Sequence, residues 1–93
     1  MPFILEIAPA AKRDLKKLPV DVKNRIIFDF LPLIQSDPYK MGQPLAGVFK
    51  GERSFHLGRK PEYRIIYFIK NNLVIVSAIG SREEIYKKAK RRS

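Results

Sequence analysis

Residues 53–69, RSFHLGRKPEYRIIYFI, decide the fold of this chain. Two runs of strand-forming residues, 53–57 and 63–69, flank a basic segment, 58–62, in which Gly and Pro favour a turn. The pattern predicts an antiparallel β-hairpin. Successive side chains of a strand point to opposite faces of the sheet, and in the second run both sets are mostly apolar. We therefore expect residues 63–69 to form a central strand.

Arg64 places a permanent positive charge in this otherwise apolar run. Arginine is almost never fully buried unless its guanidinium group is paired. We therefore expect the head group of Arg64 either to meet a carboxylate or to line a cleft that binds an anion. The candidate carboxylates are those of Glu62, Glu83 and Glu84.

The length of 93 residues suits one hydrophobic core, so we expect a single domain over residues 1–93. The net charge of +10 is uneven: residues 1–52 hold eight basic and six acidic residues, whereas residues 53–93 hold eleven and three. Such a field attracts polyanions, which indicates a nucleic-acid partner, an acidic protein partner, or only a soluble surface. The absence of cysteine and of a long apolar run favours a cytoplasmic protein without a signal peptide or membrane span.

The spacing of apolar residues predicts an α+β fold with the order β-α-α-β-β-β-α. We expect a small antiparallel sheet with an N-terminal helical hairpin packed on one face, which leaves the other face or its rim for function. Pro32 should kink the second helix. A short C-terminal helix, capped by Ser81, should fray into a basic tail at about residues 87–93. The other expected elements are a strand at 3–7, helices at 9–18 and from about 21 to 34, a loop at 37–51 with a short strand or turn at about 45–49, a turn at 71–72 and a strand at 73–79.

The candidate functional residues are cations, one histidine and one tyrosine. The carboxylates lack metal-ligand spacing and no phosphate-binding Gly-rich motif is present, so we expect neither metal nor cofactor. Such groups suit RNA cleavage by the 2′-hydroxyl of the RNA itself, because the protein need only align that group, stabilise charge on the phosphoryl oxygens and transfer protons. The set comprises Arg53, His56, Arg59, Lys60, Arg64, Arg82 and Tyr86.

Each of these residues also has a simpler interpretation. His56 can be a surface histidine, Tyr86 a core anchor with its hydroxyl in water, and Arg64 a partner in a structural ion pair. Arg59 and Lys60 can be solvated charges at the tip of the hairpin. Sequence alone leaves these alternatives open.

Several sequence motifs form one recognisable set. The most specific part is Tyr-Arg-Ile-Ile-Tyr (63–67), followed by a strand that ends in Gly80-Ser81-Arg82 and by the nearby Tyr86. The other positions of the set are Ala11, Asp14, Leu15 and Leu18, Leu45-Ala46-Gly47, Arg53 to Gly58, and Ala78-Ile79. Over nearly the whole chain, these motifs resemble the RelE/ParE superfamily of toxins from type II toxin–antitoxin systems, with the RelE-like branch favoured.

The resemblance implies an antitoxin partner, in a hetero-oligomer, and for the RelE-like branch an endoribonuclease that cleaves mRNA on the ribosome. It implies that Arg64 and Arg82 stabilise phosphate and that Tyr86 transfers a proton or stacks on the substrate. Where some RelE enzymes carry two lysines this chain has Ser54 and His56, which makes His56 the candidate base. The remaining RNA-binding candidates, for mRNA and ribosomal RNA, are Arg53, Arg59, Lys60, Lys87 and Lys88.

Two alternatives remain for the activity. One is a ParE-like inhibitor of DNA gyrase that performs no RNA chemistry, because a shared fold does not decide function. The other is a non-toxic module that binds only its antitoxin. For the ribonuclease and for both alternatives, we expect the antitoxin to offer an acidic or amphipathic segment to the basic face.

Overall fold

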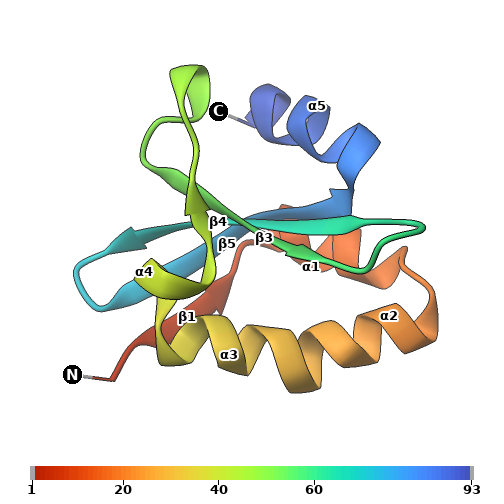
Figure 1. Ribbon diagram of the computed structural model, residues 1–93, viewed down its shortest axis with the longest axis horizontal. Coiled ribbons are helices and arrows are strands. Elements are labelled where there is room, and N and C mark those ends of the chain that lie inside the picture. Colours follow the sequence, from red (N-terminus) through yellow and green to blue (C-terminus); the bar gives the residue numbers. More distant parts are fainter. Residues whose placement is uncertain (1, 93) are drawn as a thin grey trace.

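The computed structural model describes residues 2–92 as a five-stranded sheet with helices on both faces (Figure 1). None of the helices between residues 2 and 92 combines the length and apolar character that a membrane span requires. The strands lie in the order β1-β5-β4-β3-β2 and comprise β1 (Ile4–Ile7), β2 (Gln43–Pro44), β3 (Glu52–Leu57), β4 (Tyr63–Lys70) and β5 (Leu73–Ser81). The helices are α1 (Pro9–Lys16), α2 (Val20–Arg25), the π-helical η1 (Ile26–Phe30), α3 (Leu31–Ser36), α4 (Pro38–Met41), the 3₁₀ turn η2 (Gly47–Phe49) and α5 (Arg82–Arg92).

Strand β4 is the middle strand of the sheet, which confirms the prediction from its two apolar faces. It pairs in antiparallel fashion with β3 on one side and β5 on the other. Between β4 and β5, Asn71 has a φ of 57°, in the left-handed region that Asn tolerates in tight turns. Strand β5 continues through Gly80 to Ser81 instead of ending at the glycine, so it leads directly into α5.

Strand β1 differs from the purely antiparallel sheet that we expected, because it pairs in parallel with β5. Helices, and not a short turn, follow β1 along the chain. A tight hairpin forces an antiparallel neighbour, whereas a long crossover permits either direction. The local sequence of β1 therefore predicts a strand without fixing its orientation.

The helical segment after α1 is continuous but irregular. Helix α2 passes into the five π-helical residues of η1 and then into α3, where Pro32 lies in the first turn. Proline has no N–H to donate, and its ring crowds the preceding turn of a helix. The disturbance predicted at Pro32 thus takes the form of a widened helical turn immediately before it.

The larger hydrophobic core lies between the sheet and the helices α1 to α3. Tyr67 is its largest fully buried side chain, and its hydroxyl donates a hydrogen bond to the carbonyl of Pro38 (2.6 Å). A Cβ atom at Gly42 would lie 2.2 Å from that hydroxyl, so only glycine fits there. The segment 37–51 is therefore organised around a buried tyrosine. It contains α4 and β2, which we did not expect, and the turn η2, which lies within the expected turn at 45–49.

Helix α5 covers part of the opposite sheet face (Figure 1). It continues as a helix to Arg92, so the basic segment that we expected to be a frayed tail is helical; Ser93 lies outside the described residues. A second, smaller core joins this helix to the sheet. Its buried members are Ile66, Ala78, Ile85 and Ala89.

Asp14 of α1 fixes the C-terminal end of α5 to the body of the protein. Its side chain is 3% exposed and accepts hydrogen bonds from the backbone N–H of Ile79 (3.1 Å) and from Arg92 (2.7 and 2.9 Å), with Lys88 Nζ at 3.6 Å. Burial alone would raise the pKa of Asp14, but the hydrogen bonds from Arg92 and Ile79 and the charge of Lys88 hold it below its usual value. The docking of α5 therefore depends on an ionised Asp14.

We predict that Asp14→Asn lowers the free energy of unfolding by about 2 kcal/mol at pH 7, because charge-assisted hydrogen bonds are lost. A carboxylate with a depressed folded-state pKa contributes stability above its ordinary value of 3.8, and that contribution is lost as the pH falls through the folded-state value. The difference between wild type and variant in urea unfolding should therefore shrink at low pH. The exposed Asp29→Asn is the matched control, and an equal loss in both variants would contradict this role.

Candidate functional site

Arg64 lies on the face of the sheet that α5 covers, between residues of the two neighbouring strands. Its register partners are His56 of β3 and Gly80 of β5. Gly80 leaves room beside the strand, and a Cβ atom there would lie 3.3 Å from Lys88 Nζ. The side chain of Arg64 is only 14% exposed, so protein groups have to provide most of its partners.

Two partners hold the Arg64 guanidinium. Nη1 donates a hydrogen bond to the hydroxyl of Tyr86, whose ring centroid lies 5.3 Å from the guanidinium carbon. Nη2 donates to Glu62 Oε2 at 3.2 Å. The Nε atom is buried and has no partner among the described residues. Arg64 thus meets a carboxylate, as one of the two alternatives expected, while its buried Nε–H group stays without a partner.

Glu62 joins the two candidate phosphate-binding arginines. Arg82 Nε lies 3.8 Å from the same Oε2 atom that Arg64 contacts. The backbone N–H of Arg82 also donates to the Glu62 carbonyl (3.0 Å), which ties the hairpin loop to the start of α5. Arg82 is 69% exposed and Glu62 is 25% exposed, so this side of the cluster is open to water. Two guanidinium groups and one carboxylate leave the cluster with a net positive charge.

His56 lies directly across from Arg64 and is exposed. Its partial removal from water lowers its pKa below 6.5, and the positive charge of Arg64 and, less strongly, of Arg82 lowers it further. Glu62 acts in the opposite direction. A neutral imidazole at pH 7 can accept a proton, so its protonation state suits a base.

Tyr86 projects from α5 and packs its ring against Phe49 of η2, with ring centroids 5.6 Å apart. The ring of Tyr86 therefore packs against the smaller core, while its hydroxyl group accepts the hydrogen bond from Arg64. The two interpretations proposed for Tyr86 are compatible, because the ring anchors α5 and the hydroxyl belongs to the cluster. Sequence analysis did not identify Phe49, which no motif marks.

The RNA-binding candidates fall into different places. Arg59 and Lys60 line a hollow of about 350 Å³ together with Glu62 and Arg82, next to the cluster. Arg53 lies on the other face of the sheet, where its Nη2 donates to the carbonyls of Tyr39 (2.5 Å) and Gly42 (2.8 Å). Lys87 is exposed on α5, whereas Lys88 is mostly buried and lies near Asp14 (3.6 Å) and Glu84 (3.9 Å).

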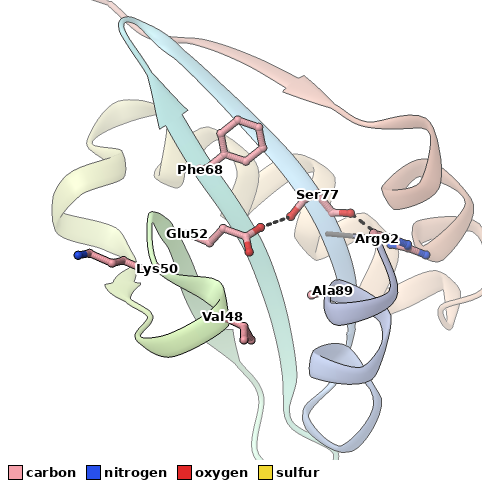
Figure 2. A pocket seen from close by; sticks show the side chains of 7 residues that line it. All are labelled: Val48, Lys50, Glu52, Phe68, Ser77, Ala89 and Arg92. Atoms are coloured by element: carbon pink, nitrogen blue, oxygen red, sulfur yellow. Dashed lines mark hydrogen bonds between the residues drawn. The ribbon is translucent and has the colours of Figure 1, made fainter.

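A second hollow of about 360 Å³ opens beside the C-terminal half of α5 (Figure 2). Inside it, the Ser77 hydroxyl donates to Glu52 Oε1 (3.2 Å) and the Ser77 carbonyl accepts from Arg92 (3.2 Å). None of the predicted site residues lines this hollow. Its lining consists of Val48, Lys50, Glu52, Phe68, Ser77, Ala89 and Arg92.

The structure thus brings together the four predicted catalytic residues, which come from β3, β4 and α5, and adds Glu62 to them. Glu62 appeared in the sequence analysis only as one of three possible partners of Arg64. Its position in the sequence could have singled it out, because Glu62 and Arg64 are two residues apart, and side chains with this spacing on an extended segment point to the same side. Glu83 and Glu84 make no ion pair with either arginine among the described residues.

Comparisons with known proteins agree on one superfamily of toxins. Residues 5–86 match the family described as the ParE toxin of type II toxin–antitoxin systems. Toxin RelE of Mycobacterium tuberculosis is 33% identical over 69 residues, which cover 73% of this chain and 67% of that toxin. Toxin RelG of the same organism is 27% identical over 90 residues, which cover 95% of this chain and all (100%) of that toxin.

Solved structures share the fold. A chain of the toxin–antitoxin complex RelBE2 from Mycobacterium tuberculosis superposes with a TM-score of 0.79 at 25% identity, covering 88% of this chain and 100% of that chain. A double mutant of Escherichia coli toxin RelE in the free state gives a TM-score of 0.79 at 24% identity, covering 99% and 98%. The toxin–antitoxin complex DinJ-YafQ of Escherichia coli gives 0.69 at 20% identity, covering 89% and 96%.

We predict that His56, the only histidine, titrates below 6.5 in the folded protein, and that Arg82→Ala moves its pKa upward because a nearby positive charge is removed. Lys12→Ala on α1 is the control that removes one charge elsewhere. The imidazole C–H resonances give the pKa directly by NMR titration. An unchanged midpoint in Arg82→Ala would show that the two side chains do not interact in solution.

Proposed function

The chain belongs to the ParE toxin family within the RelE/ParE superfamily, so it is a toxin of a type II toxin–antitoxin system, and we propose that it acts as an endoribonuclease that cleaves mRNA on the ribosome. One observation carries this proposal. Arg64, Arg82, Tyr86 and His56 come from separate elements and meet at one solvent-open place with a net positive charge.

In this proposal the RNA supplies its own nucleophile. The 2′-hydroxyl oxygen attacks the adjacent phosphorus, the bond from phosphorus to the 5′-oxygen breaks, and the products are a 2′,3′-cyclic phosphate and a 5′-hydroxyl. His56 takes the proton of the 2′-hydroxyl, and its lowered pKa keeps it neutral and ready to do so at pH 7. Tyr86 gives a proton to the departing 5′-oxygen, and its contact with Arg64 fixes the direction of its hydroxyl.

Arg64 and Arg82 have a different task, which is to stabilise charge on the phosphoryl oxygens. Fixed guanidinium groups do this well in a site that is partly shielded from water. Arg64 is held by Tyr86 and by Glu62, so it needs little reorganisation during the reaction. Arg82 is exposed and beside the hollow lined by Arg59 and Lys60, which suits it to capture the incoming phosphate.

The antitoxin is the partner that follows from the family. The solved relatives include RelBE2 and DinJ-YafQ toxin–antitoxin complexes. The charge of +10 on this chain favours an antitoxin segment that is acidic or amphipathic. Such a segment laid over the cluster would mask the phosphate-binding arginines from RNA.

A second candidate function is inhibition of DNA gyrase, because the matching family is that of the ParE toxins. The same fold serves both branches, so the site has to decide between them. A cluster with a neutral imidazole, a phenol and two guanidinium groups is suited to phosphoryl transfer, whereas a purely inhibitory contact needs none of the proton-transfer groups. The site therefore favours the ribonuclease.

We predict that Arg64→Ala combined with Arg82→Ala reduces mRNA cleavage on ribosomes by at least about 10²-fold, since loss of a single transition-state donor typically costs that much. Cleavage is followed by primer extension with purified components. Lys12→Ala combined with Lys16→Ala on α1 removes the same charge away from the cluster and should leave cleavage unchanged. Full cleavage by the arginine variant, with its fold and antitoxin binding intact, would refute the site.

We also predict that inducing the chain without its antitoxin arrests growth and produces discrete mRNA ends that depend on translating ribosomes. DNA cleavage linked to gyrase, without new mRNA ends, would instead establish the ParE-like activity. Normal growth at a verified level of folded protein would identify a non-toxic module.

If His56 is the base, we predict that the His56→Ala variant cleaves mRNA on ribosomes at least about 10²-fold more slowly than wild type. Primer extension with purified components measures this rate.

A further inference from the structure

The carboxylate of Glu62 occupies the centre of the arginine pair. A single oxygen, Oε2, lies 3.2 Å from Arg64 Nη2 and 3.8 Å from Arg82 Nε. Among the side chains of residues 2–92, no other carboxylate is in ion-pair contact with either guanidinium group. An oxygen held between two guanidinium groups is also the position that a phosphoryl oxygen takes when two arginines bind it.

We propose that Glu62 is an internal competitor of the RNA phosphate: its carboxylate fills the anion site between Arg64 and Arg82 until the substrate displaces it. This inference rests on the proposed function, because it concerns the same two arginines. A carboxylate and a phosphodiester each carry one negative charge, so charge alone gives the RNA no advantage over Glu62.

The attachment of Glu62 makes it an effective competitor. Its carbonyl accepts the backbone hydrogen bond of Arg82 (3.0 Å), and strand β4 begins at the next residue, so the main chain at Glu62 is fixed close to both guanidinium groups. A group tethered next to its binding site has a high effective concentration there. Free RNA, which arrives from solution, therefore competes poorly.

The same surroundings allow the carboxylate to leave. The side chain of Glu62 is 25% exposed and borders the 350 Å³ hollow, so it can turn towards water without movement of the main chain. A phosphodiester can then make stronger contacts than the carboxylate that it displaces. Its two non-bridging oxygens can each bind one arginine, whereas Glu62 uses one oxygen for both.

Competition by Glu62 gives a physical reason why the proposed mRNA cleavage would require the ribosome. An mRNA held in place on a ribosome that also binds the toxin has a high effective concentration of its own, which offsets the advantage that tethering gives to Glu62. RNA in free solution lacks this advantage. Glu62 therefore sets a threshold that ribosome-held RNA passes and free RNA does not.

The test compares Glu62→Gln with wild type in the full-length protein. The probe is a fluorescent single-stranded RNA in which every nucleotide is 2′-O-methylated, so that it binds but cannot be cleaved, and its affinity is measured by anisotropy without ribosomes. We expect the dissociation constant to fall at least about fivefold, which corresponds to about 1 kcal/mol. The control is Glu6→Gln, at an exposed position of the edge strand β1. It removes the same negative charge and should change the affinity for RNA less than twofold.

A second comparison separates competition from a general effect on folding. If Glu62 acts through the anion site, the gain in affinity from Glu62→Gln should vanish when Arg64→Ala and Arg82→Ala are both present, because no guanidinium group is then left for the carboxylate to occupy. The gain should persist when Lys12→Ala is present instead. A gain no larger than that of Glu6→Gln, in a variant with an unchanged urea midpoint, overturns the proposal. So does a gain that survives the loss of both arginines.

Failure of the Glu62 competitor and failure of the ribonuclease would give different results. Cleavage of ribosome-bound mRNA by wild type, together with no gain in affinity for Glu62→Gln, would leave the ribonuclease standing and remove the competitor. A gain in affinity without cleavage by wild type or variant would support the anion site and contradict the ribonuclease. If both hold, Glu62→Gln should also cut ribosome-free RNA at least about fivefold faster than wild type.

Discussion

A guanidinium group on the central strand of a small sheet is the constraint on which the rest of this structure depends. Arg64 cannot reach bulk water easily, and an unpaired charge shielded from water costs several kcal/mol. The strand itself offers no partner, since its neighbours in register are a histidine and a glycine. The hairpin loop and α5 therefore both have to approach Arg64, the first with Glu62 and the second with Tyr86.

Helix α5 approaches under conditions that are unfavourable for a helix alone. It has 11 residues and many basic side chains, and isolated helices of this length are marginal in water. Two contacts compensate: a small core that buries Ile85 and Ala89, and the ionised Asp14 that binds Arg92 at the far end. Because both contacts hold α5 in place, the position of the Tyr86 hydroxyl depends on both of them.

The sequence was sufficient to predict the features that depend on local pattern. Apolar residues on both faces of the run 63–69 identified β4 as central, and the asparagine pair identified the following turn. The direction of β1 and the helical state of residues 87–92 depend on partners far away in the chain, such as the contact of Arg92 with Asp14, 78 positions earlier. Arg53 illustrates the same limit, because the two carbonyls it binds belong to a segment without periodicity. Three carboxylates were possible partners of Arg64, and only the folded hairpin selects Glu62.

This selection links stability to activity. In the absence of substrate, the positive cluster needs an anion, and Glu62 provides one that is always present. A site with no internal carboxylate would bind phosphate more readily but would hold two guanidinium groups close together with less compensation, which destabilises the folded state. Proteins commonly trade stability against activity in their active sites. Under the proposal that Glu62 competes with RNA, this trade falls on one side chain, whose charge, length and exposure determine both how firmly the free toxin holds its arginines and how readily it releases them to RNA.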